Sequence, residues 1–152
     1  FTNGFRADYT KWAEGYRISV KGNQVSWYKS KEKDYSYKTF RAYLDVVFAY
    51  AGTLSLAKEL TSVPETSMQI GDVLIQGGSP GHAVIVVDMA EHPVTGEKLY
   101  LLAQSYMPAQ DIQVLVNPKE RDKSPWYTLK GEGNILTPEW GFTSADLKRF
   151  KD

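Results

Sequence analysis

A histidine and a glutamine near the ends of two neighbouring predicted strands are the residues best placed to do chemistry. His82 follows Gly81 and begins a β-branched segment that runs to Asp88, and Gln104 ends the apolar segment that comes next. A histidine that acts as a general base must keep one tautomer, which an amide or carboxylate partner can fix. We therefore expect Gln104 to orient His82 at the mouth of a sheet. The alternative, which the sequence leaves open, is a structural histidine that donates to a backbone carbonyl.

The composition argues against several other kinds of catalytic site. The chain has no cysteine, so it supplies no disulfide, thiolate metal ligand or cysteine nucleophile. No Gly-x-Ser-x-Gly elbow is present, and Ser105 would face away from Gln104 if the strand continued that far. The possible metal ligands lack a helical or paired spacing, so we expect no metal and no cofactor. They are His82, His92, Asp72 and Asp88. We expect Asp72 to accept backbone N–H bonds instead, and His92 to be exposed.

The aromatic residues offer a second kind of site, one for binding. Exposed rings could stack on sugars or line a peptide groove, although a large aromatic side chain more often fills a core. A loop held by proline can present a ring rigidly, so Ser124-Pro125-Trp126-Tyr127 is the best candidate for the rim of a site. We expect Trp126 and Tyr127 to contact substrate, together with Ser79 in the turn at 77–81.

Length and charge limit the class of protein. The 152 residues suit one domain, so we expect a single domain over residues 1–152. Lys and Arg together number 18, as do Asp and Glu, so no net charge favours nucleic acid or an anionic membrane as partner. No apolar run approaches the roughly 20 residues that a transmembrane helix needs. The oligomeric state is left open.

Hydrophobic spacing predicts helices and one hairpin in the first part of the chain. In the clearest helix apolar residues recur at i, i+3, i+4 and i+7, and Gly52 should stop it in the left-handed conformation. The expected elements are a helix capped by Asp8 that ends near Gly15, a hairpin over 17–28, the helix at Lys38–Tyr50 and a short helix at Leu54–Leu60.

From Gly71 onward the pattern changes to strands. The segment at 82–88 is β-branched and nearly continuous, which predicts a central strand buried on both faces. Further strands are expected at 72–75, 98–104 and 111–115 and within 131–138, followed by a terminal helix at Ser144–Phe150 that Ser144 caps. Helices followed by an antiparallel meander are typical of the α+β class. We predict an antiparallel sheet of about five strands packed against the Lys38–Tyr50 helix.

The segments around His82 resemble the second half of papain-like peptidases of the NlpC and CHAP types. The shared order is Gly71-Asp72-Val73, a turn, Gly81-His82-Ala83-Val84-Ile85-Val86-Val87, and a strand that ends in a polar residue, here Gln104. Those enzymes cleave peptide or amide bonds of bacterial cell walls with a cysteine nucleophile at a helix N-terminus. The resemblance covers about Gly71–Ser105. It implies a papain-like core with His82 as general base and Gln104 as its orienting partner.

Four segments resemble, more closely, a family of uncharacterised secreted bacterial proteins defined only as a domain of unknown function. They are Phe1-Thr2-Asn3-Gly4-Phe5, Tyr50-Ala51-Gly52-Thr53-Leu54-Ser55-Leu56, Gly81–Asp88 and Gln104–Asp111. This resemblance covers nearly the whole chain and implies an extracytoplasmic location: secreted, periplasmic or lipid-anchored. It also implies that members carry a further N-terminal segment with a cysteine-bearing helix. The chain would then be the C-terminal part of a longer papain-like domain.

The missing cysteine divides the functional predictions in two. If the Lys38–Tyr50 helix is matched to the catalytic helix of the NlpC type, the nucleophile position falls near Phe40, which cannot attack a carbonyl. We expect the histidine-bearing part of a papain-like cell-wall amidase or peptidase, inactive by itself. The alternative is a non-catalytic module that binds cell-wall peptide or glycan on the same scaffold. Joint exposure of Trp126 and Tyr127 on one face would favour that alternative.

Overall fold

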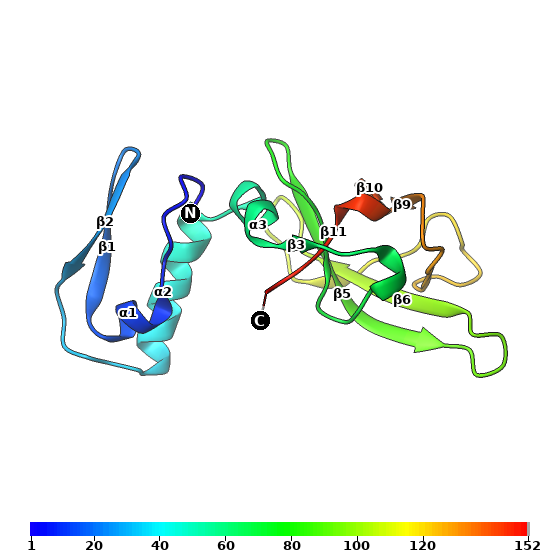
Figure 1. Cartoon of the computed structure of the whole chain (residues 1–152), viewed down its shortest axis with the longest axis horizontal. Coiled ribbons are helices and arrows are strands. Elements are labelled where there is room, and N and C mark those ends of the chain that lie inside the picture. The colour runs from blue at the N-terminus through cyan, green and yellow to red at the C-terminus, as the bar shows by residue number, and fades with distance from the viewer. Residues whose placement is uncertain (152) are drawn as a thin grey trace. The chain divides into compact units, whose positions relative to one another are not determined.

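The computed structural model describes residues 1–151, which divide into two compact units (Figure 1). The first unit is Phe1–Ser55 and the second is Leu56–Asp152, and each has its own sheet. The single domain expected over residues 1–152 stays a prediction.

The N-terminal unit begins with a short helix and a hairpin, both as predicted. α1 (Tyr9–Ala13) is capped by Asp8, whose carboxylate accepts a backbone N–H of the first turn at 3.1 Å. β1 (Tyr16–Lys21) pairs antiparallel with β2 (Gln24–Lys29). Gly22 in the connecting turn has a φ of +60°, which glycine adopts without steric cost.

The long helix α2 (Tyr37–Tyr50) is confirmed, but it ends differently from the prediction. The backbone leaves the helix at Ala51, whose φ of −104° and ψ of 145° are extended, and Gly52 does not take a positive φ. The left-handed stop predicted at Gly52 is therefore wrong. Gly52 belongs to the start of α3 (Thr53–Glu59), because its N–H donates to the Ser55 hydroxyl at 3.0 Å.

Aromatic contacts join α1 to α2 within the N-terminal unit. The ring of Tyr43 lies 5.3 Å from that of Tyr9 and 6.1 Å from that of Trp12, centroid to centroid. The Trp12 indole N–H donates to the Thr39 carbonyl at 3.1 Å. The expected packing of α2 on the main sheet stays a prediction.

The second unit is built on an antiparallel sheet of seven strands, two more than predicted. Its main path has the order β3, β11, β4, β5, β6 and β7, and β8 pairs with β6. The bounds are Thr61–Ser62 (β3), Val73–Gln76 (β4), His82–Glu91 (β5), Lys98–Gln104 (β6), Gln113–Val114 (β7), Tyr127–Thr128 (β8) and Leu147–Arg149 (β11). The α+β class and strands β4, β5 and β6 are confirmed. β3 and β8 have two residues each, which is too short for a periodic pattern to reveal.

A second hairpin and two 3₁₀ turns complete this unit. β9 (Asn134–Leu136), which lies in the predicted segment 131–138, pairs antiparallel with β10 (Gly141–Thr143). The 3₁₀ turns are η1 (Glu65–Ser67) and η2 (Ser144–Asp146). The loop that joins β9 to β10 contributes to the candidate site.

Only one face of β5 is buried, so the prediction of a strand buried on both faces is wrong. His82, Val84 and Val86 are buried, whereas Ile85 and Val87, which alternate with the valines, are 38% and 37% exposed. β-branched residues occur on both faces of this strand because they favour an extended backbone. Their presence does not require both faces to be buried. The buried face packs into a core that includes Leu74, Leu102, Leu115, Phe142 and Leu147.

The C-terminal segment is a turn followed by a strand, so the helix predicted over Ser144–Phe150 is wrong. The cap is Thr143, whose backbone N–H and hydroxyl both bond to the Asp146 carboxylate, at 2.7 and 3.1 Å. β11 then pairs with β3 on one side and β4 on the other, and Leu147 is fully buried. Pairing on two edges outweighs the weak helical pattern of so short a segment.

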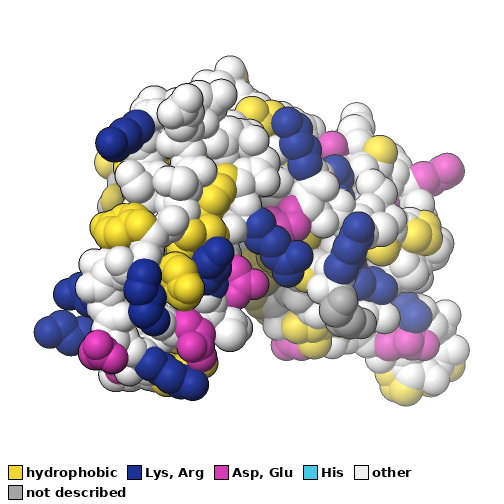
Figure 2. Space-filling model, turned by 60° about the vertical axis from the view of Figure 1, so that its left-hand side comes forward, with side chains coloured by type: hydrophobic (Ala, Val, Ile, Leu, Met, Phe, Trp, Pro, Cys, Tyr) yellow, Lys and Arg dark blue, Asp and Glu magenta, His cyan; other side chains and the backbone are white. Residues whose placement is uncertain are grey.

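The surface carries both signs of charge. Figure 2 shows Lys and Arg side chains beside Asp and Glu side chains over the face in view. This arrangement agrees with the zero net charge of the sequence. Among residues 1–151, no helix has the length and apolar character needed to cross a membrane.

Candidate functional site

The sheet brings His82 and Gln104 to the same buried face. His82 is the first residue of β5 and lies opposite Gln76 of β4. Val86, on the same face as His82, pairs with Leu102 of β6, so Gln104 also points inward. The glycine-containing turn before Gly81 ends at this point, which leaves the histidine at the edge of the core.

The two predicted residues are in direct contact. His82 Nε2 lies 2.5 Å from Gln104 Oε1. His82 is 9% exposed and Gln104 is 3% exposed, so little water competes for this hydrogen bond. The partner of Nε2 is thus a side-chain amide, and not the backbone carbonyl that the structural alternative would have required.

Three aromatic rings surround the imidazole of His82. Tyr106 contacts it edge-on with a centroid distance of 5.1 Å, Trp140 lies tilted at 5.5 Å, and Phe142 lies nearly parallel at 6.1 Å. Phe142 is buried in the core, whereas Tyr106 and Trp140 are half-buried. The ring is therefore held on its faces by packing and at Nε2 by a hydrogen bond.

A pocket of about 390 Å³ opens on the imidazole. Its apolar lining includes Pro80, Met107 and Ala109 beside Tyr106 and Trp140, and its polar lining is Ser105, Gln110 and His82. No Asp, Glu, Lys or Arg of the described residues lines it. Nδ1 of His82 has no hydrogen-bond partner among the described residues and is not enclosed, so it is the ring nitrogen available to the pocket.

Ser105 also lines this pocket, next to Gln104. A continued strand would have turned its side chain away from Gln104, but β6 ends at Gln104, before Ser105. Ser105 is exposed.

The three residues predicted to contact substrate do not line the pocket at His82. Ser79 is exposed in the turn, and the lining begins at Pro80. Tyr127 is 4% exposed, stacks on Tyr100 at 5.6 Å and donates its hydroxyl to the Val116 carbonyl at 2.7 Å. Burial raises the pKa of Tyr127 above its usual value. Tyr127 is thus a core residue.

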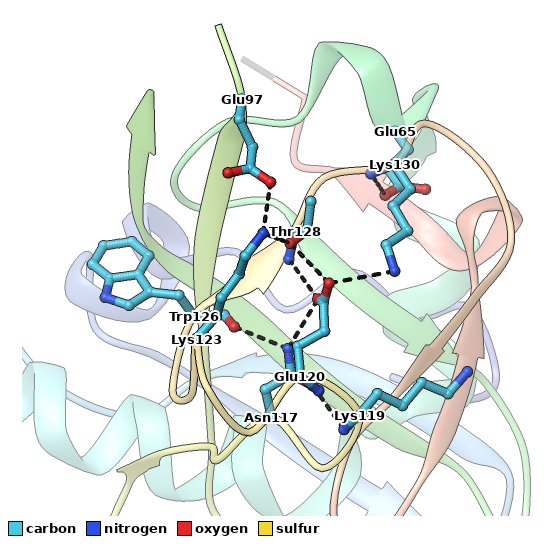
Figure 3. A network of polar contacts seen from close by, with 9 residues as sticks. All are labelled: Glu65, Glu97, Asn117, Lys119, Glu120, Lys123, Trp126, Thr128 and Lys130. Atoms are coloured by element: carbon cyan, nitrogen blue, oxygen red, sulfur yellow. Dashed lines mark hydrogen bonds and ion pairs between the residues drawn. The ribbon is translucent and has the colours of Figure 1, made fainter. Parts of the chain in front are cut away.

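Trp126 is half-buried, and a polar network fixes the loop that carries it (Figure 3). The Asn117 amide donates to the Trp126 carbonyl at 2.9 Å, and the Glu120 carboxylate accepts from the Thr128 N–H and hydroxyl. Burial alone would raise the pKa of Glu120. These hydrogen bonds and the charge of Lys130 outweigh it, so the pKa lies below its usual value.

A second cavity lies beside this network and measures about 40 Å³, against about 390 Å³ at His82. Glu65 lines it and is 3% exposed. One carboxylate oxygen of Glu65 accepts the Lys130 N–H at 3.3 Å, and the other has no partner among the described residues. The small cavity has room for water, and not for a peptide or sugar.

The possible metal ligands of the sequence have other contacts. Asp72 accepts the Gln69 N–H at 2.9 Å and two N–H bonds of Arg149 at 2.7 and 2.8 Å, which confirms its expected structural role. His92 is exposed, as predicted, and its Nδ1 accepts two backbone N–H groups of its own loop. Among the described residues no cluster of three or more His, Asp or Glu side chains could hold a metal ion.

Two residues of the site come from the loop between β9 and β10. Gln104 Nε2 donates to the Glu139 carboxylate at 2.8 Å, and Trp140 contributes its ring. No pattern in the sequence distinguishes Glu139, because it is a single carboxylate in a loop, 35 positions from Gln104.

The comparisons with known proteins identify a family and no activity. Neither the curated proteins nor the solved structures include a significant match to the chain. One family model matches residues 1–149, and its description is a domain of unknown function. The predicted resemblance to a family defined only in that way is therefore confirmed, and the chain belongs to the family DUF4846, a domain of unknown function.

Proposed function

We propose that the chain supplies the histidine half of a hydrolytic site that cleaves a peptide or amide bond. His82 is the general base, Gln104 orients it, and the nucleophile comes from outside these 152 residues. The observation that carries the proposal is the contact between His82 Nε2 and Gln104 Oε1 at the wall of the pocket.

The geometry supports this role because a general base needs one ring nitrogen held and the other accessible. Nε2 is bound to a buried amide, and Nδ1 is available to the pocket. The aromatic rings limit rotation of the imidazole, so its free nitrogen keeps one direction. A histidine that only stabilised the fold would gain nothing from a cavity beside its free nitrogen.

The lining of the pocket supports an uncharged substrate group. Aromatic and apolar side chains dominate, with Ser105 and Gln110 as neutral hydrogen-bonding groups. A backbone amide next to a small apolar side chain fits such a surface, whereas a carboxylate or ammonium group would have no partner of opposite charge. Bacterial cell-wall peptides offer bonds of this kind, so the proposed place of action is outside the cytoplasm.

The nucleophile must be external because the sequence has no cysteine. The first experiment is to purify the protein from its native host, determine its N-terminal sequence and count its thiols. A longer chain with one reactive thiol is the expected result. A native chain that begins at Phe1 and holds no thiol would overturn cysteine chemistry at this site.

The second experiment measures hydrolysis of cell-wall peptides by that native protein. His82→Ala should abolish turnover, and Gln104→Ala should lower it by about 10²-fold or more, because the imidazole loses its fixed orientation. His92→Asn is the matched control, since Asn can still accept the loop N–H groups, and it should leave the rate unchanged. Full activity in His82→Ala would overturn the proposal.

The alternative function is a binding module for cell-wall peptide or glycan. It depended on Trp126 and Tyr127 being exposed together, and Tyr127 is buried. The pocket at His82 remains as the surface such a module would use. Tight binding of cell-wall fragments without turnover by the native protein would favour this alternative over hydrolysis.

A further inference from the structure

We propose that Glu139 is a positioning residue that sets the tautomer of His82 through the side-chain amide of Gln104. The proposal rests on the proposed function for its catalytic meaning, but the hydrogen bonds that carry it are independent of any activity. Glu139 does not line the pocket and acts only through Gln104.

The direction of the Gln104 amide follows from the chemistry of its two neighbours. An ionised carboxylate can only accept hydrogen bonds, so the group that faces Glu139 at 2.8 Å must be the NH₂ of Gln104. The amide oxygen is then directed at His82. The opposite orientation would place the amide oxygen against the carboxylate and leave two acceptors facing each other.

The direction of the amide in turn decides which ring nitrogen of His82 carries the proton. An amide oxygen only accepts, so Nε2 at 2.5 Å must be the N–H donor. A neutral imidazole has one N–H, so Nδ1 is unprotonated and offers its lone pair to the pocket. Glu139 thereby selects the form of His82 that can accept a proton from a nucleophile.

A turn built around Thr137 fixes the backbone of Glu139. The N–H and the hydroxyl of Thr137 both donate to the Trp140 carbonyl at 2.8 Å, and the Trp140 N–H donates to the Thr137 hydroxyl at 3.1 Å. Thr137 is 2% exposed. Glu139 lies inside this closed turn, so its backbone is held in place and its exposed side chain extends from a defined position.

The same loop holds the face of the imidazole by an equivalent chain of bonds. The Asp146 carboxylate accepts Gln76 Nε2 at 2.9 Å, which directs Gln76 Oε1 to the Trp140 indole N–H at 2.9 Å. Trp140 then lies against His82. The same order of groups, a carboxylate, a glutamine amide and a ring N–H, thus occurs twice beside the histidine. This repetition supports positioning as the role of Glu139.

The test is ¹⁵N NMR of the two imidazoles in this 152-residue chain, at a pH at which both rings are neutral. The chain has two histidines, so His92→Asn assigns the signals. The wild-type protein should show His82 in the Nε2–H form. In Glu139→Lys the ammonium group can only donate hydrogen bonds, so it binds the amide oxygen of Gln104. The NH₂ group of Gln104 is then directed at His82. The major tautomer of His82 should then change from Nε2–H to Nδ1–H.

A double variant supplies the rescue. When Gln104→Glu is combined with Glu139→Lys, the oxygen that faces His82 belongs to a carboxylate, which can only accept a hydrogen bond, and the introduced ammonium group pairs with that carboxylate. The Nε2–H form should therefore return. Glu59→Lys makes the same charge change at an exposed position of α3 and should leave the tautomer unchanged. The backbone amide spectrum verifies the fold of each variant.

An Nε2–H tautomer that persists in folded Glu139→Lys would overturn the proposal, as would an equal change in Glu59→Lys. The NMR result does not depend on turnover, so a failure of the hydrolysis experiments leaves it intact. The converse outcome is hydrolysis that requires His82 while the tautomer stays unchanged in Glu139→Lys. That outcome would overturn the positioning role of Glu139 and leave the proposed function intact.

Discussion

At the scale of single residues, the candidate site depends on a buried amide with a different partner at each end. Gln104 joins a ring N–H to a carboxylate, and both bonds are lost if the amide is removed. A buried polar group left without a partner costs more than the lost bond itself, because it was desolvated on folding. Gln104 should therefore matter for stability as well as for orientation.

Replacing Gln104 by leucine keeps the volume of the side chain and removes both hydrogen bonds. We expect a loss of about 1–3 kcal/mol in the free energy of unfolding, because His82 keeps a buried N–H without an acceptor. Urea denaturation measures this loss. Gln110→Leu is the matched control, since Gln110 is an exposed glutamine of the same pocket, and it should stay within about 0.5 kcal/mol of wild type. Equal effects of the two changes would contradict the argument.

How much of the site the sequence could predict depends on where its members lie along the chain. His82 begins β5 and Gln104 ends β6, the next strand, which runs in the opposite direction, so alternation alone places them together. Glu139 and Gln76 reach the site from other segments, and their side chains depend on tertiary packing that no local pattern encodes. The burial of Tyr127 was not foreseen for a similar reason, because a proline before an aromatic pair does not tell which ring faces the core.

At the scale of elements, long periodic segments were predicted well and short ones were not. β6 has the predicted bounds Lys98–Gln104, and α2 begins one residue earlier than predicted. The segment 144–150 is only seven residues long, and Leu147 with Phe150 fits a helical spacing as well as a strand with one buried residue. Pairing with the edges of β3 and β4 decides between these structures, and the residues of those strands lie about 73 to 88 positions earlier in the chain.

The two apolar residues of this segment give a test of that assignment. Leu147 is fully buried in β11, whereas Phe150 is 52% exposed. Leu147→Ala should lower the free energy of unfolding by about 2–5 kcal/mol, because it leaves a cavity among packed strands. Phe150→Ala should change it by less than about 1 kcal/mol. In the helix that the sequence predicted, both side chains would share one face, so similar losses in thermal or urea unfolding would contradict the strand.

At the scale of the whole molecule, the core is distributed unevenly along the chain. Both hydrophobic clusters of the described residues lie in the second unit, one around Leu74, Leu102 and Phe142 and a smaller one around Val73 and Ile75. The first unit buries few side chains, mainly Trp12 and Ala13, and its sheet is a single hairpin. An isolated two-stranded hairpin is marginally stable in water. All residues of the candidate site belong to the second unit.

We therefore expect a fragment of residues 52–152 to fold alone and a fragment of residues 1–51 to remain unfolded. The cut before α3 keeps that helix whole, because Leu56 and Ala57 pack against the smaller cluster. About 100 residues are enough for one independent core, and a fragment of about 50 residues with few buried side chains is not. The measurements are the dispersion of the amide NMR spectrum and the cooperativity of thermal unfolding. The longer fragment should also keep the Nε2–H tautomer of His82, since every bond that sets it lies within this unit. An unfolded 52–152 fragment would show that the second unit requires the first, and would support the single domain predicted from the sequence.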